Sequence, residues 1–170
     1  MITLLQNGDA YFPALEAALD RAAYNIYLET YIFENDHTGR RIAEALRRAA
    51  LRGVVTHLLI DGFGSNRLPK TMIDYLKEAG VMVFKFRPQI SPWTFQRKRL
   101  RRLHRKIVVI DQSLAFVGGI NIIDDLDMPD QNEPRYDYAV RVEGPVVKEI
   151  SASSRRLWIR VAWRRLLQFD

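Results

Sequence analysis

The amino-acid sequence predicts an α/β fold in which a mixed β-sheet is flanked by helices on both faces. Three times within the first 86 residues, a stretch with helical spacing of apolar residues leads into an apolar, β-branched stretch. Two further short apolar stretches follow at 107–110 and 114–117, separated by three polar residues. The alternation predicts a sheet covered by helices, and the close pair of stretches adds an antiparallel hairpin.

The repeating units are placed by the spacing of their apolar residues and by the glycines that end them. Apolar residues at helical spacing predict helices around 13–23, 42–49 and 72–76, and Gly53 and Gly80 close the second and third. The stretches that follow, 25–33, 54–60 and 81–86, have the composition of buried strands.

The second half of the chain is less regular. Prolines and a basic run interrupt any regular pattern after Arg87. We therefore expect a loop before the hairpin, and we expect it to cross the side of the sheet that carries the motif described below. The acidic segment 124–135 is expected to be a loop, and 136–142 a strand. Pro145 stands at the expected start of a closing helix with an apolar stripe that ends at Val161. Because no linker interrupts residues 1–170, we expect a single domain.

Charge and composition limit the functions that the chain can have. The chain lacks cysteine, which excludes disulfides, thiolate metal sites and a cysteine nucleophile. No apolar run approaches the roughly 20 residues needed to cross a bilayer, and the first residues do not form a signal peptide. The net charge is +6. Much of it falls within ten positions, at Arg97, Lys98, Arg99, Arg101, Arg102, Arg105 and Lys106. This run is either a solvated face or a surface for a polyanionic partner, and its position directly beside the motif below favours the partner.

The segment LHRKIVVID carries the chemistry. It places His104, Lys106 and Asp111 in the order His-x-Lys-x4-Asp, and the chain continues to Gly118, Gly119 and Asn121. Residues two apart on a strand point to the same side, so the imidazole and the ammonium are expected to face one cavity. The imidazole can attack phosphorus while the ammonium balances the charge that builds on the phosphate oxygens. The glycines would let the backbone approach that phosphate, and the asparagine offers an amide donor.

With this spacing the sequence resembles the phospholipase D superfamily, whose signature is His-x-Lys-x4-Asp followed by Gly-Gly or Gly-Ser, any residue, and Asn. The wider chain is similar to the N-terminal half of bacterial cardiolipin synthases that lack transmembrane helices. The similarity is carried by the segments LLQNGDAYFPAL, YLETYIFENDHTG, LLIDGFGS, LHRKIVVID and DYAVRVEGP. It implies that residues 1–170 form one phospholipase D-like lobe.

The resemblance implies a phosphatidyltransferase that makes cardiolipin through a phosphohistidine. One histidine attacks phosphorus, and a histidine of a second motif protonates the departing alcohol and then activates the incoming one. This chain has one such motif, because neither His37 nor His57 is accompanied by the required Lys and Asp. The second motif would come from a missing second lobe, which we favour, or from a second copy in a homodimer.

The partners implied are anionic phospholipids, met by the basic and aromatic stretch 93–106 at the membrane surface. The expected location is peripheral, on the cytoplasmic face of the bacterial inner membrane. The alternative is a homodimeric nuclease or phosphodiesterase of the same superfamily, in which the basic run would follow a nucleic-acid backbone. A third possibility is that the isolated half only folds or binds.

Roles for the remaining polar residues are less specific. A nucleophilic histidine needs its other ring nitrogen held by an acceptor, and the resemblance assigns this orienting part to Asp137. Asp111 could contact the catalytic site or could instead fix the hairpin turn. Glu29 and Asp61 are expected to be structural carboxylates, and His37 and His57 ordinary surface or core residues. We expect neither a metal nor another cofactor, since the histidines lack ligand spacing and Lys106 would repel a cation.

Overall fold

The computed structural model describes residues 1–87, 102–124 and 136–166, with the backbone alone described at 165 and 166. One seven-stranded sheet has the strand order β1-β7-β6-β5-β2-β3-β4. Its strands are β1 (Ile2–Gln6), β2 (Asn25–Thr30), β3 (Val55–Asp61), β4 (Met82–Phe86), β5 (Ile107–Ile110), β6 (Leu114–Gly118) and β7 (Tyr138–Glu143). The helices are α1 (Asn7–Arg21), α2 (His37–Leu51), α3 (Lys70–Glu78) and α4 (Val146–Leu166).

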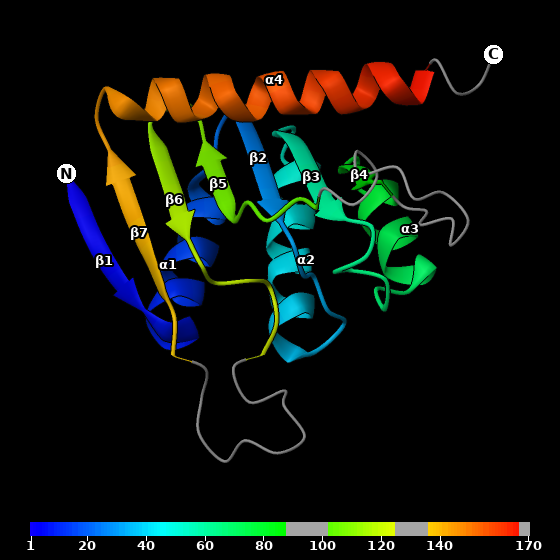
Figure 1. The fold of residues 1–170 in the computed structure, drawn as a ribbon, viewed down its shortest axis with the longest axis horizontal. Coiled ribbons are helices and arrows are strands. Elements are labelled where there is room, and N and C mark those ends of the chain that lie inside the picture. The colour runs from blue at the N-terminus through cyan, green and yellow to red at the C-terminus, as the bar shows by residue number, and fades with distance from the viewer. Residues whose placement is uncertain (88–101, 125–135, 167–170) are drawn as a thin grey trace.

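Helices lie on both sides of the sheet, as the sequence predicts. The helices α1, α2 and α3 cover one face, and the long α4 crosses the strands on the other (Figure 1). Successive side chains along a strand point to opposite faces of the sheet, so each strand contributes apolar side chains to the core on both faces. Val108 and Phe116 face the main core with α1 and α2, whereas Val109 and Ala115 pack with Val147 of α4.

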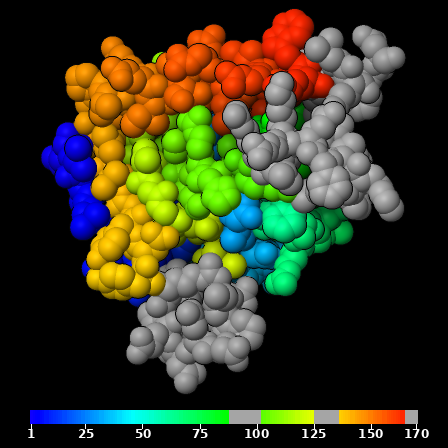
Figure 2. Space-filling view, viewed as in Figure 1, coloured from blue at the N-terminus to red at the C-terminus, as the bar shows by residue number. Residues whose placement is uncertain are grey.

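The sheet is mixed, and its strand directions bring functional segments to one edge. Strands β2, β3 and β4 are parallel, whereas β5 pairs antiparallel with both β2 and β6. The carboxyl ends of β2, β3 and β6 therefore lie at the same edge as the start of β5 and the start of β7. Figure 2 shows the side of the sheet that α4 crosses, with β5 and β6 visible beside the helix.

Two elements differ from the sequence prediction. The edge strand β1 was not expected, and it forms because its backbone pairs antiparallel with β7 from Ile2↔Val142 to Gln6↔Tyr138. The helix α1 begins at Asn7 rather than near Pro13, so this proline lies inside the helix. The expected loops at 88–101 and 125–135 lie outside the described residues, as do Trp93 and the first half of the basic run. Within the described part of the chain, no helix is long and apolar enough to cross a membrane.

Candidate active site

The motif residues lie where the strand ends meet. His104 and Lys106 come directly before β5, at the edge reached by the carboxyl end of β2. The ring of Tyr31, the residue after β2, contacts both of them. The His104 imidazole lies 4.4 Å from the Tyr31 ring, centroid to centroid, and the Lys106 Nζ lies 5.6 Å from the centroid of the same ring. The two motif side chains thus contact the same aromatic ring, although both precede the strand, and the single cavity expected from their spacing stays a prediction.

The backbone that carries His104 is held by Asp61. This carboxylate ends β3 and is fully buried. Its Oδ2 accepts a hydrogen bond of 2.7 Å from the backbone N–H of Leu103, the residue before His104. Its Oδ1 accepts from the N–H groups of Phe63 and Gly64 at 2.9 and 3.0 Å. Asp61 therefore joins the turn after β3 to the segment that presents the imidazole.

The same turn also holds Tyr31. The buried Ser65 hydroxyl donates to the Tyr31 carbonyl oxygen and accepts from the N–H of Phe33, both at 3.0 Å. A Cβ placed on Gly64 would collide with the carbonyl oxygen and the ring of Tyr31. Only glycine fits there without displacing the ring on which His104 lies.

Asn121 lies beside this arrangement. Its Oδ1 accepts a 3.0 Å hydrogen bond from the N–H of Ile32, the neighbour of Tyr31. The next residue, Ile122, continues the contact as a parallel bridge with Phe33. Because the side-chain oxygen is used by the backbone, the amide nitrogen is the group left to donate to a substrate oxygen. The structure therefore brings Asn121 to the segment that also contacts His104.

The structure gives a reason, not evident from the sequence, why glycine stands at both glycine positions of the motif. A Cβ on Gly118 would collide with the backbone of β7 at Tyr138 and Ala139, and a Cβ on Gly119 would collide with the carboxylate of Asp137. At Gly118 and Gly119 the groups that lie close to the backbone are therefore β7 and the Asp137 carboxylate. Close approach to a phosphate, which we expected for these glycines, stays a prediction.

Asp137 lies at the expected edge, but the expected hydrogen bond to His104 is not formed. Its Oδ1 accepts from the N–H of Tyr138 at 2.7 Å, and the described residues show no hydrogen bond between the carboxylate and the imidazole. The imidazole instead lies against Tyr31. The hydrogen bond from Asp137 to His104 is thus absent among the described residues, and the orienting role of Asp137 stays a prediction.

Asp111 is the motif residue that the structure separates from the others. It follows the far end of β5, at the opposite edge of the sheet from His104. Its carboxylate accepts hydrogen bonds from the N–H groups of residues 23, 24 and 25 at 2.8, 2.8 and 2.9 Å. These bonds fix the chain entering β2, whereas the structural role expected for Asp111 was to fix the hairpin turn. A catalytic contact between Asp111 and the His104 site does not fit this position, because β5 lies between them.

A buried ion pair supports the motif from the α4 side. The Nε of Arg105, the residue between His104 and Lys106, lies 2.9 Å from Oε2 of Glu29, whose side chain is 3% exposed. Burial raises the pKa of Glu29, and the Arg105 charge opposes that rise. Glu29 and Asp61 thus both have structural partners, and both hold residues adjacent to His104.

The other histidines lie away from the motif. His37 is exposed at the start of α2. His57 is buried, and its Nδ1 is 3.1 Å from the carbonyl oxygen of Ile26. Among the described residues, no group of three His, Cys, Asp or Glu side chains could hold a metal ion.

The fold matches that of a solved structure. The structure resembles that of Nuc, described as a phospholipase D family member from Salmonella typhimurium, with a TM-score of 0.70 and 19% sequence identity. The match covers 96% of this chain and 94% of Nuc. The mixed sheet with helices on both faces is therefore a phospholipase D-like fold.

Sequence comparison places the chain within a family. Residues 15–158 match the family described as "Cardiolipin synthase, PLD-like domain", and the chain belongs to it. The chain is 39% identical to cardiolipin synthase B of Shigella flexneri and 33% identical to cardiolipin synthase 1 of Bacillus anthracis. These matches cover 96% and 92% of this chain. They cover 41% and 31% of the two synthases, so the chain spans less than half the length of these relatives.

Proposed function

We propose that the chain supplies half of the active site of a phosphatidyltransferase that makes cardiolipin from phospholipids. The observation that carries the proposal is the meeting of His104, Lys106 and Asn121 around the segment that starts at Tyr31. An exposed imidazole beside an ammonium and an amide donor suits attack on an anionic phosphodiester. The match to cardiolipin synthases over nearly the whole chain supports the lipid substrate.

The chemistry has two steps. In the first, a ring nitrogen of His104 forms a bond to phosphorus, and the bond from phosphorus to the alcohol of the donor lipid breaks. The departing alkoxide takes a proton from a second histidine, which this chain does not provide. In the second step that histidine removes a proton from the hydroxyl of the acceptor lipid, whose oxygen displaces His104 from phosphorus. The positive charge of Lys106 and the amide of Asn121 stabilise the phosphate oxygens in both steps.

The second histidine comes from a second lobe or from a second copy of the chain. We favour the second lobe, because the curated relatives are more than twice as long as the part that matches. Anionic phospholipids are the proposed partners, and peripheral attachment to the cytoplasmic face of the bacterial inner membrane is the proposed location. Arg102 and Lys106, next to the site, would favour an anionic surface.

The alternative is a homodimeric nuclease or phosphodiesterase. Residues 1–170 contain one His-x-Lys-x4-Asp motif, and in this alternative two copies of the chain would complete a symmetric site. The chemistry at His104 would be the same. The substrate would be nucleic acid, and affinity would fall steeply with salt concentration.

A transfer assay separates the proposals. The intact protein is incubated with vesicles of labelled phosphatidylglycerol, and in parallel with single- and double-stranded DNA. We expect labelled cardiolipin, a loss of several orders of magnitude in His104→Ala, and a loss of roughly a hundred- to thousandfold in Lys106→Ala. DNA cleavage without cardiolipin formation would replace the proposal by its alternative. Full lipid transfer by His104→Ala would refute both.

A further inference from the structure

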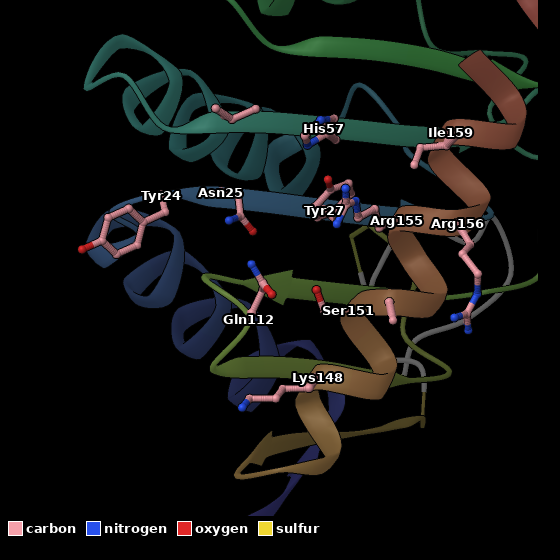
Figure 3. Close-up of a pocket in the computed structure, with 12 residues that line it drawn as sticks. Tyr24, Asn25, Tyr27, His57, Gln112, Lys148, Ser151, Arg155, Arg156 and Ile159 are labelled. Carbon is pink, nitrogen blue, oxygen red and sulfur yellow. The ribbon is translucent and has the colours of Figure 1, made fainter. Parts of the chain in front are cut away.

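A second polar site lies at the edge of the sheet opposite His104. A groove of about 630 Å³ runs between α4 and the starts of β2 and β3 (Figure 3). This volume falls within the range of small-molecule sites. Because β2 leads from this edge to Tyr31 at the other, the groove is separated from the motif residues by the length of the strand. The proposed transfer reaction makes no use of it.

The charge of the groove is positive. Lys148, Arg155 and Arg156 of α4 border it, and none of the described residues that line it is an Asp or a Glu. Figure 3 shows Arg155 directed toward Tyr27 on β2, whereas Arg156 is directed outward. The field of Arg155 reaches the groove, since it opposes the rise that burial causes in the pKa of Tyr27. Lys148 lies seven residues before Arg155, on the same side of the helix. An anionic group in this groove would meet positive charge from one wall.

The opposite end of the groove offers neutral hydrogen-bonding groups. The side-chain amides of Asn25 and Gln112 point toward one another there (Figure 3). The Oδ1 atom of Asn25 is buried and has no hydrogen-bond partner among the described residues. A buried acceptor of this kind favours a donor such as a hydroxyl group. The adjacent Asp111 carboxylate, although held by three N–H groups, also favours hydroxyl hydrogens over an anion at this end.

The floor between the two ends is aromatic. The Tyr27 ring stacks on the His57 imidazole at 4.1 Å between centroids, with 3° between the planes. His57 in turn packs edge-on against Trp158 of α4. The close approach of His57 Nδ1 to the Ile26 carbonyl oxygen requires a proton on this nitrogen. Burial lowers the pKa of His57 and so favours the neutral ring. The positive charge of the groove is carried by Lys148, Arg155 and Arg156 of α4.

We propose that this groove binds the phosphate ester of a small polyol, with the phosphate toward Arg155 and the hydroxyl groups toward Asn25 and Gln112. The ligand chemistry has two possible sources, a free polyol phosphate or the glycerol-phosphate headgroup of a lipid. Binding here does not depend on the function proposed for His104, because the two sites share no residue and lie at opposite edges of the sheet.

The experiment uses glycerol 3-phosphate as the probe. It is titrated into protein that carries His104→Ala and Lys106→Ala, so that the motif site does not contribute to binding. We expect saturable binding by calorimetry and movement of the Asn25 and Gln112 side-chain amide signals in NMR spectra. Arg155→Gln should weaken binding at least tenfold, whereas Arg164→Gln, an exposed arginine of α4 outside the groove, should change it less than twofold.

Two further probes test the two ends and the source. Inorganic phosphate should bind at least fivefold more weakly than glycerol 3-phosphate, because it lacks the glycerol hydroxyl groups that reach the amides. Vesicles of phosphatidylglycerol in phosphatidylcholine should compete with glycerol 3-phosphate if the lipid headgroup is the source, and should leave its binding unchanged if the free ester is. The proposal is overturned if glycerol 3-phosphate does not saturate, if both arginine variants weaken it equally, or if inorganic phosphate binds as tightly.

Discussion

Replacing Asp61 by Asn should separate the positioning of His104 from the stability of the fold. The carboxylate accepts three backbone hydrogen bonds in a fully buried place, and one of them holds the residue before His104. The amide has one oxygen. If this oxygen keeps its bonds to the turn, the NH₂ group faces the Leu103 N–H, and two donors oppose each other.

The magnitude follows from these bonds. A hydrogen bond to a charged group contributes about 1.5–3 kcal/mol, and leaving the buried N–H unpaired adds to the loss. We expect the free energy of unfolding to fall by roughly 2–4 kcal/mol. The displaced segment carries the nucleophile, and a misplacement of about 1 Å can cost on the order of a hundredfold in rate. The expected result is a kcat that falls at least tenfold while KM changes less than threefold.

The assay compares transfer kinetics and thermal unfolding of Asp61→Asn with those of Leu19→Ala. Leu19 is fully buried in α1, away from the motif, and its truncation should cost about 2–5 kcal/mol of stability. At a temperature where both variants are folded, Leu19→Ala should keep its kcat within twofold. The reasoning is refuted if Asp61→Asn is folded and keeps the wild-type kcat, or if Leu19→Ala loses as much activity.

Three other predictions use different contacts. Gly64→Ala should push the Tyr31 ring from its place and lower kcat at least tenfold, and an unchanged kcat in this variant would exclude Tyr31 as the support of the nucleophile. Asp111→Asn should lower the midpoint of thermal unfolding, since three N–H bonds to a carboxylate are weakened, and should leave kcat of the folded enzyme within threefold; a hundredfold loss of kcat would restore its catalytic role. His57→Phe should reduce the loss of stability in acid. The folded-state pKa of His57 is lowered from its usual 6.5, so the unfolded chain takes up the proton first and stability falls as pH drops below about 6.5. Denaturant unfolding of both proteins at pH 7.5 and pH 5.5 checks this, and an equal loss in the two would contradict it.

Local patterns predicted most of the fold and the centre of the site. The repeated change from helical to strand spacing predicted β2, β3 and β4 and the helix before each of them. A helix that buries one face and a strand that is wholly buried each leave a recognisable pattern of apolar residues in the sequence. The motif predicted that His104, Lys106 and Asn121 lie near one another. His104 and Lys106 precede β5 and Asn121 follows β6, and these two antiparallel strands begin and end at the same edge of the sheet. The closing helix α4 was likewise expected from its apolar stripe.

Contacts between distant segments could not be predicted in the same way. The short strand β1 has no strong pattern of its own and forms by pairing with β7, more than 130 residues later. Tyr31 and Asp61 support His104 across 73 and 43 positions of sequence, so their part in the site depends on strand order. Asp111 stands close to His104 in sequence, yet β5 carries it to the opposite edge of the sheet. A tyrosine after one strand and an Asp-Gly-x-Gly-Ser turn after its neighbour are the signals that could have indicated the support.

The central claim is that His104 forms the covalent bond to phosphorus, and trapping that bond tests it most directly. The intact protein is mixed with a phospholipid labelled in its phosphate, quenched in alkali within milliseconds to seconds, digested and analysed by mass spectrometry. A phosphohistidine is stable in alkali and labile in acid, so the label should remain on the peptide that contains His104 and should be lost at low pH. It should be absent from His104→Ala and present in Leu19→Ala. Label on another residue of the wild-type protein, or equal labelling of His104→Ala, would contradict the account.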